Sequence, residues 1–259
     1  MNWVQLEKKL FETKSSFQKI EVYQTKDVGK TLFLDGVEQF SDLDEHIYHE
    51  TMANVPLSIH KNPNNILIIG GGDGGIAREC LKNKSVQKID LCEIDVEVVN
   101  VCKNFFPQTS KSLKDSKVNL IIDDAKDYIN STKNFYDIII VDSTDPISNA
   151  IPLFDEDFYV NLNNILNDNG LIVSQIQTVA FDVTSSSDFF NFLYKNFKYL
   201  DCFDIKYCRP LKEQHLLFCI LSQQEITVPK KYLENFKLNY PNYKKIKNIL
   251  NKAKWIKNN

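Results

Sequence analysis

Residues 66–75 read ILIIGGGDGG, an all-apolar run that meets a glycine-rich loop, and IARECLKN (76–83) follows with helical periodicity. A short apolar run bounded by glycines predicts a buried strand. Glycines directly after such a strand let the backbone approach a ligand at the carboxyl edge of a sheet. The stretch therefore predicts a strand, a ligand-binding turn and a helix in succession.

The same alternation continues to about residue 225. Further strands are predicted at KIDLCEID (88–95), KVNLIID (117–123), YDIIIVD (136–142), GLIVSQI (170–176) and HLLFCIL (215–221), with helices at 96–106, 155–166 and 186–197. Continuous runs of Val, Ile and Leu that alternate with helices indicate a mostly parallel sheet covered on both faces. We expect a doubly wound α/β domain over about residues 60–225.

The region before this domain is predicted to be rich in β-structure. FQKIEVYQT (17–25) and KTLFLDG (30–36) alternate apolar and polar residues, as meander strands do. A helix is predicted within residues 42–57, ending before Pro56. We expect a β-meander domain with its connecting helix (1–60) and a catalytic domain (61–259) that ends in a lysine-rich tail. We interpret this tail as a solvated amphipathic helix; the alternative is a contact with nucleic acid or another acidic partner.

Composition excludes several classes of protein. The 259 residues carry a net charge of −3, and 43% are hydrophobic, which fits a globular chain without a chain-wide basic field for nucleic acid. No apolar run approaches the roughly 18–20 residues that span a bilayer, and the N-terminus lacks an apolar signal segment, so we expect a cytoplasmic protein without a membrane partner. The six cysteines form no CxxC pair, which predicts reduced, buried thiols and no metal.

Glu93 ends the second predicted strand of the larger domain, 23 positions after Gly70. An acid there can accept hydrogen bonds from both ribose hydroxyls of a nucleoside. Gly70, Gly72 and Gly75 fit the spacing GxGxxG, which NAD enzymes and methyltransferases share. Together these features predict an adenosine-containing ligand without saying which one.

Asp73 lies inside the glycine loop and narrows the choice. Its carboxylate would repel a pyrophosphate or an amino-acid carboxylate and attract a ligand arm that bears only an ammonium group. A decarboxylated sulfonium nucleoside with an aminopropyl arm fits that requirement. The alternative is that Asp73 merely caps the helix that begins near Gly74.

VDSTDP (141–146) and YHE (48–50) are two further candidate segments. Asp142 or Asp145, just beyond a strand, could accept a proton from an amine or hold its cationic form, although Asp-Pro also forms turns. Neighbouring residues on a helix point in different directions, so only some of the YHE side chains can face one site. A single histidine on a helix is more often a core or surface residue than a catalyst.

Several of these motifs, in fixed order, resemble the polyamine aminopropyltransferases, the spermidine synthase family. The match runs over roughly residues 15–175 through LDGVEQFSDLDEHIYHE, NILIIGGGDGGIARE, KIDLCEID, DDA, IIIVDSTDP and LFDEDFYVNL. The resemblance implies a small N-terminal β-domain followed by a Rossmann-like, methyltransferase-type domain in a homodimer or homotetramer. It also implies transfer of an aminopropyl group from decarboxylated S-adenosylmethionine, a co-substrate, to putrescine, which gives spermidine and methylthioadenosine without a cofactor or metal.

The resemblance also implies roles for individual residues. The nucleoside would be held by Gln18, Gly70, Gly72, Glu93, Asp124, Ala125 and Asn149. Asp73 would bind the aminopropyl ammonium, and the amine would be bound by Tyr48, His49, Asp142, Ser143, Thr144 and Asp145. Asp142 would be the proton acceptor, and because an unperturbed carboxylate is a weak base, we expect it to act partly by positioning the amine.

Three segments depart from the family pattern, and all of them surround the expected amine. Ile147 is followed by Ser-Asn-Ala instead of Gly-Pro-Ala, YCRPLKEQH (207–215) replaces a Tyr-Pro-x-Gly segment, and IQTVAF (176–181) lacks the aromatic residue that is usual for the family after Gln175. Transfer to another amine and N-methylation of a diamine with intact S-adenosylmethionine therefore stay open. A binding protein that has lost turnover and, last, an NAD oxidoreductase are the remaining alternatives.

Overall fold

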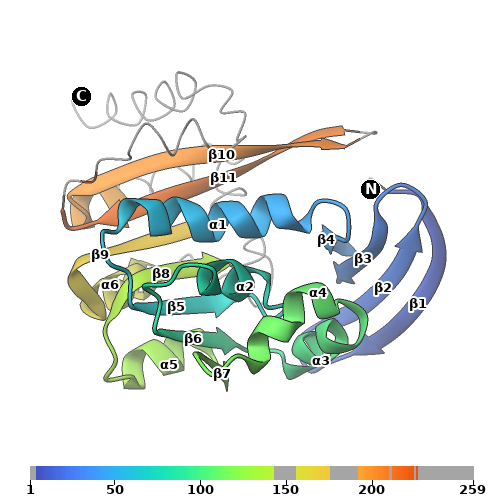
Figure 1. The fold of residues 1–259 in the computed structure, drawn as a ribbon, viewed down its shortest axis with the longest axis horizontal. Coiled ribbons are helices and arrows are strands. Elements are labelled where there is room, and N and C mark those ends of the chain that lie inside the picture. Colours follow the sequence, from blue (N-terminus) through green and yellow to red (C-terminus); the bar gives the residue numbers. More distant parts are fainter. Residues whose placement is uncertain (1–3, 143–155, 176–191, 210–211, 225, 227–259) are drawn as a thin grey trace.

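The computed structural model describes residues 4–142, 156–175, 192–209, 212–224 and 226. They form a four-stranded antiparallel sheet followed by a larger α/β unit (Figure 1). The first sheet is a meander of β1 (Leu6–Lys14), β2 (Lys19–Thr25), β3 (Gly29–Leu34) and β4 (Val37–Ser41). The predicted meander is confirmed, and it includes a first strand, β1, whose largely exposed residues gave no clear alternation.

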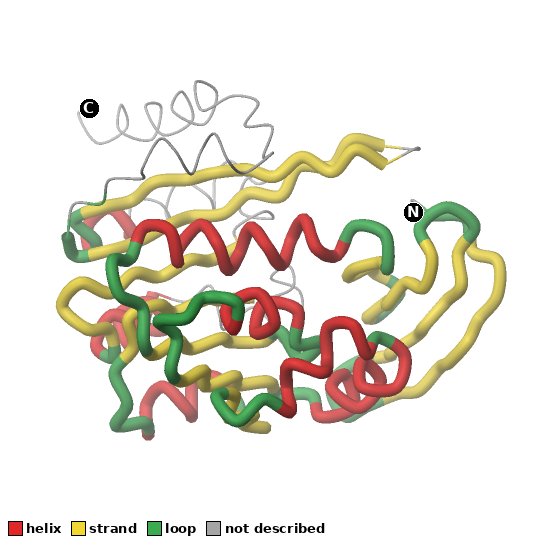
Figure 2. Tube along the Cα trace, viewed as in Figure 1, coloured by secondary structure: helices red, strands yellow, loops and turns green. Residues whose placement is uncertain are grey.

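The larger sheet has seven strands in the order β10-β11-β9-β8-β5-β6-β7. Figure 2 shows strands in yellow and helices in red. The strands are β5 (Asn65–Gly70), β6 (Lys88–Glu93), β7 (Val118–Ile122), β8 (Tyr136–Asp142), β9 (Leu166–Gln175), β10 (Tyr199–Arg209) and β11 (Lys212–Ser222). Strands β5 to β9 pair in parallel, whereas β11 pairs antiparallel with β9 and β10. The prediction of a doubly wound, mostly parallel sheet after a β-domain is confirmed.

Helices cover this sheet on both faces. They are α1 (Glu45–Ile59), α2 (Gly75–Leu81), α3 (Val96–Phe105), α4 (Pro107–Ser110), α5 (Ala125–Ser131) and α6 (Glu156–Asn164), with a 3-10 turn, η1, at Lys111–Lys114. Alternate residues of β5 enter different cores: Ile66 and Ile68 pack with Met52 of α1, whereas Leu67 and Ile69 pack with Phe158 of α6. This division explains why β5 is apolar throughout.

The strand order reverses between β5 and β8. From β5 the chain runs to β6 and β7 on one side, and then returns to β8 and β9 on the other side. Ligands of open α/β sheets bind at such a switch point, beyond the carboxyl ends of the strands. At this point Gly70, the last residue of β5, is in register with Asp142, the last residue of β8.

The prediction that the helix within residues 42–57 ends before Pro56 is wrong, because α1 continues through Pro56 to Ile59. Proline lacks the amide hydrogen that an interior helical position needs, which is why an earlier end was expected. Here Pro56 lies in the final turns, its carbonyl accepts a hydrogen bond from the His60 amide, and Leu57 is buried in the core beneath the helix. Burial of this last turn therefore outweighs the missing bond.

The N-terminal sheet packs on α3. Ile20, Val22 and Phe40 share a core with Val98 and Phe106, at the two ends of the α3 region. This packing brings the β1–β2 turn to the edge of the larger sheet, where Ser15 Oγ lies 2.7 Å from Asp95 Oδ2. The sequence patterns did not predict β1, β4, α4, α5 or β10. The predicted helix 186–197 is described over residues 192–196, and the tail from Pro229 lies outside the described residues.

The described cysteines Cys80, Cys92, Cys102 and Cys219 are free and buried, as predicted. Among the described residues, no helix is long and apolar enough to cross a membrane.

Candidate active site

Three carboxylates from separate elements gather at the carboxyl edge of the large sheet. Asp73 lies in the loop between β5 and α2, Glu93 ends β6, and Asp142 ends β8. The exposed fractions of Asp73 and Glu93 are 8% and 9%. A cluster of three partly desolvated acids favours cationic ligands. The structure thus brings together the three acids that sequence analysis selected in this region.

The glycine loop gives these acids their positions. Gly70, Gly71 and Gly74 have positive φ angles of 78°, 69° and 84°, which glycine adopts without strain. A Cβ atom on Gly70 would lie 2.1 Å from the carbonyl oxygen of Asp142, and one on Gly72 would lie 2.9 Å from Glu93 Oε2. The loop therefore packs directly against both acids, a role for these glycines in addition to the expected approach to a ligand.

Glu93 is held by backbone amides. Its Oε2 accepts a hydrogen bond from the Gly72 amide at 3.1 Å, and its Oε1 accepts one from the Asp95 amide at 2.9 Å. Burial raises the pKa of Glu93 to about 7, and the two amide bonds only partly oppose this rise. A pair of hydroxyl donors would stabilise the ionised form, so the side chain suits the ribose of a nucleoside.

Asp142 accepts a hydrogen bond from the hydroxyl of Tyr48, which also lies 2.9 Å from Gln175 Oε1. Burial, with a further contribution from the charge of Asp73, raises the pKa of Asp142 to about 6, while Tyr48 and His49 act in the opposite direction. A carboxylate with an ordinary pKa is a weak base at neutral pH, whereas one with a pKa near 6 accepts a proton more readily.

Asp73 caps α2, which is one of the two functions that the sequence left open. Its Oδ1 accepts a hydrogen bond from the Gly75 amide at 2.6 Å, at the first turn of α2, so the side chain does cap this helix. The same oxygen lies 3.2 Å from His49 Nε2. Both described contacts thus go to Oδ1, and Oδ2 is the oxygen available to a cationic ligand.

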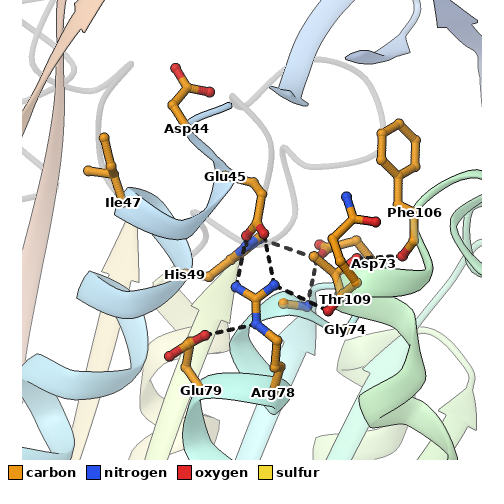
Figure 3. A network of polar contacts seen from close by, with 12 residues as sticks. Asp44, Glu45, Ile47, His49, Asp73, Gly74, Arg78, Glu79, Phe106 and Thr109 are labelled. Carbon is orange, nitrogen blue, oxygen red and sulfur yellow. Dashed lines mark hydrogen bonds and ion pairs between the residues drawn. The ribbon is translucent and has the colours of Figure 1, made fainter. Parts of the chain in front are cut away.

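His49 is a buried residue with a carboxylate on each ring nitrogen (Figure 3). Its Nδ1 lies 2.6 Å from Glu45 Oε2, and Arg78 binds the same Glu45 through two nitrogens. Sequence analysis selected His49 but missed Glu45 and Arg78. The spacing of four between Glu45 and His49 on one helix was a signal that could have found the first of them.

Three further residues expected to bind the nucleoside, Gln18, Asp124 and Ala125, lie around the ends of β6 and β7. Gln18 donates a hydrogen bond through Nε2 to Asp95 Oδ2 at 3.0 Å, so it reaches this edge from the N-terminal sheet. Asp124 caps α5 by accepting a hydrogen bond from the Lys126 amide, and Ala125 begins that helix. Asp95, which caps α3 and binds Gln18, was missed although it lies two positions after Glu93. The selected Ser143, Thr144, Asp145 and Asn149 lie outside the described residues.

Comparisons with known families match both parts of the chain. The profile described as "Spermine/spermidine synthase domain" matches residues 45–231, and the one described as "Spermidine synthase tetramerisation domain" matches residues 3–42. The first match alone covers more than half of the chain, including every described carboxylate of the site.

Individual relatives and solved structures agree with this match. Polyamine aminopropyltransferases of Methanocaldococcus jannaschii and Caldicellulosiruptor saccharolyticus are 45% and 42% identical over 67% and 68% of this chain, but the matches span only 59% and 63% of those relatives. A crystal structure of spermidine synthase from Thermotoga maritima has a TM-score of 0.80 at 30% identity, covering 94% of this chain and 84% of that one. A spermidine synthase complex with the transition-state analogue AdoDATO gives 0.81 at 30% identity, covering 93% and 84%.

Proposed function

The chain belongs to the spermine/spermidine synthase family, and we propose that it transfers the aminopropyl group of decarboxylated S-adenosylmethionine to putrescine, giving spermidine and methylthioadenosine. The observation that carries this proposal is the convergence of Asp73, Glu93 and Asp142 at the switch point of the sheet. Three acids suit two cationic substrates, and their spacing along the edge suits a nucleoside with a charged arm.

In this proposal each acid has a separate task on the donor or the acceptor. Glu93 accepts hydrogen bonds from the ribose, with Gln18, Gly70, Gly72, Asp124, Ala125 and Asn149 around the rest of the nucleoside. Asp73 Oδ2 holds the ammonium of the aminopropyl arm. This arm would then point along the loop from Glu93 toward Asp142, where the acceptor amine binds.

The reaction is a single displacement at carbon. The neutral amine nitrogen attacks the methylene group next to the sulfonium, a C–N bond forms, the C–S bond breaks, and methylthioadenosine leaves with the electron pair. The nitrogen loses one proton, which Asp142 accepts. Its pKa of about 6 supports this role, because a general base works best when its pKa is near the working pH.

Tyr48 supports the same step by orienting Asp142. Orientation of two bound reactants accounts for a large part of the rate in such displacements. Ser143, Thr144 and Asp145 would complete the amine site.

We also propose a homo-oligomer formed through the N-terminal sheet. Its support is the match to the tetramerisation domain and the half-exposed Val37 on β4.

The experiment is product analysis by mass spectrometry with the purified full chain. Decarboxylated S-adenosylmethionine is supplied with putrescine, cadaverine, agmatine or spermidine in separate reactions. We expect putrescine to gain one aminopropyl group and methylthioadenosine to appear in equal amount. If only another amine gains an aminopropyl group, that amine is the acceptor instead of putrescine. The departures from the family pattern at residues 147–150 and 207–215 allow this outcome. Methyl transfer from intact S-adenosylmethionine, or no product with either donor, would overturn the proposal.

A further inference from the structure

A line of charged side chains runs from α2 through α1 to the glycine loop (Figure 3). Its members are Arg78, Glu45, His49 and Asp73, and each contacts the next. The side chains of Glu45 and His49 are 7% and 2% exposed. Buried charges are costly unless they are paired, so the complete pairing along this line is what makes it stable.

Arg78 fixes the far end of the line. Its Nη1 and Nη2 donate to Glu45 Oε1 and Oε2 at 2.8 and 2.9 Å, a two-point contact that defines the plane of the carboxylate. Its Nε donates to Glu79 Oε1 at 2.8 Å, so the guanidinium itself is held on a second side. Glu45 therefore has a single orientation, with Oε2 directed at His49.

His49 is held at both ring nitrogens. Nδ1 faces Glu45 and Nε2 faces Asp73, so both nitrogens act as donors and the ring is an imidazolium. Burial on its own lowers the pKa of His49, but the two carboxylates outweigh burial and raise it to about 10. The ring also packs edge-on against Phe40, and a Cβ atom on Gly75 would lie only 2.2 Å from it.

These contacts leave His49 without a ring nitrogen for a substrate amine, and its positive charge would repel a diamine. The charged or titratable groups around the ring are Glu45 and Tyr48 from α1, Asp73 from the loop, and Asp142 from β8. The geometry assigns His49 to Asp73 instead of to the amine channel that the family resemblance implied.

We infer that Glu45 and Arg78 are positioning residues that act through the His49 imidazolium, holding Asp73 by Oδ1 so that Oδ2 faces the ammonium group of the donor. The inference rests on the proposed function for the identity of that ligand arm. With His49 and the Gly75 amide both on Oδ1, the line of charges fixes how the Asp73 carboxylate is turned.

The experiment follows His49 in the full-length protein by NMR of its ring nitrogens between about pH 6 and pH 9. In the unaltered chain the ring is expected to remain an imidazolium throughout. Titration of the ring near the ordinary histidine pKa of about 6.5 would overturn the inference, without any variant having to fold.

Glu45→Gln then separates positioning from folding. The variant keeps the shape of the side chain but removes the charge at Nδ1, so His49 should titrate within this pH range. Binding of decarboxylated S-adenosylmethionine should be close to that of the unaltered chain at about pH 6 and about tenfold weaker at about pH 9. Binding of methylthioadenosine, which has no ammonium arm, should stay unchanged at both.

Glu21→Gln is the matched control, because Glu21 is a similarly buried glutamate, paired with Lys9 and Lys19 in the N-terminal sheet, and it takes no part in the line of charges. It should leave the binding of the donor at both pH values unchanged. Equal pH responses of the two variants, or none in Glu45→Gln, would overturn the inference. The readouts are binding and ring titration, so failure of the proposed reaction would appear separately, as absence of product from the unaltered chain.

Discussion

The hydroxyl of Tyr48 on α1 donates a hydrogen bond to Asp142 Oδ1 at the end of β8, across 94 positions of sequence. The contact joins the helix that follows the N-terminal sheet to the switch point of the large sheet. It stabilises the ionised form of an acid whose pKa is raised by burial. Tyr48 therefore limits how far burial raises the pKa of Asp142.

Tyr48→Phe should move the acidic limb of the pH–rate profile to higher pH. Without the hydroxyl, the pKa of Asp142 rises above about 6, and the fraction of ionised enzyme at neutral pH falls. We expect kcat/KM to fall severalfold at about pH 6.5 and much less at about pH 8.5. Tyr23→Phe, which removes a similar hydroxyl–carboxylate contact in the N-terminal sheet, should leave the limb in place. A uniform loss at every pH would contradict the assigned role.

Asp142→Asn should abolish most turnover while it stabilises the protein. Loss of a general base typically costs about 10²–10⁴ in rate, and binding of methylthioadenosine should not change. The folded state raises the pKa of Asp142 from 3.8 to about 6, so the folded protein binds more protons than the unfolded chain between these values and loses stability as pH rises. At about pH 8 the variant should therefore unfold at a higher temperature than the unaltered chain. At about pH 3.5 the two proteins should unfold at similar temperatures. Equal turnover would refute the role of Asp142.

The sequence predicted the positions of Asp73, Glu93 and Asp142 because each follows an apolar strand, and strand ends of a parallel sheet meet at one edge. It also predicted most strands of the large sheet, whose continuous apolar runs are unambiguous. The limits of α1 were less clear, because Pro56 marks a helix end locally and only tertiary burial of Leu57 extends the helix.

What the sequence could not provide was the environment of each acid. The raised pKa values of Glu93 and Asp142 depend on burial beneath a loop whose glycines allow a close approach. The contact of His49 with Asp73 likewise depends on how α1 crosses the loop. Such distances arise from packing between segments far apart in the chain, which residue type and spacing do not specify.

Asp73→Asn should distinguish the donor from its product. Loss of the negative charge removes the partner of the aminopropyl ammonium, so binding of decarboxylated S-adenosylmethionine should weaken about tenfold or more. Methylthioadenosine lacks that ammonium and should bind as before in isothermal titration. Asp168→Asn, at an exposed position of β9, serves as the control and should change neither affinity. Equal weakening of both ligands would place Asp73 elsewhere in the site.

Binding of methylthioadenosine should itself depend on the ionisation of Glu93. Ribose hydroxyls donate best to a carboxylate, so affinity should rise with pH up to about 7, where the folded Glu93 becomes ionised, and then level off. Titration calorimetry near pH 6.5 in buffers of different ionisation enthalpy should detect release of protons on binding. Glu93→Gln should remove this pH dependence and weaken binding, whereas Glu12→Gln on β1 should retain it. A pH-independent affinity in the unaltered chain would exclude Glu93 as the ribose acceptor.

Gly70→Ala and Gly36→Ala form a matched pair that measures the contact between the loop and Asp142. Both glycines have φ of 78°, so both substitutions introduce the same backbone strain, on the order of 1 kcal/mol. Only at Gly70 does the new Cβ meet an obstacle, the Asp142 carbonyl oxygen at 2.1 Å, whereas nothing lies within 4 Å at Gly36. A backbone atom cannot rotate away, so β5 and β8 must separate, and urea unfolding should show at least about 2 kcal/mol of additional destabilisation in Gly70→Ala. Equal losses would mean that the two strand ends separate easily and that the loop does not fix the position of Asp142.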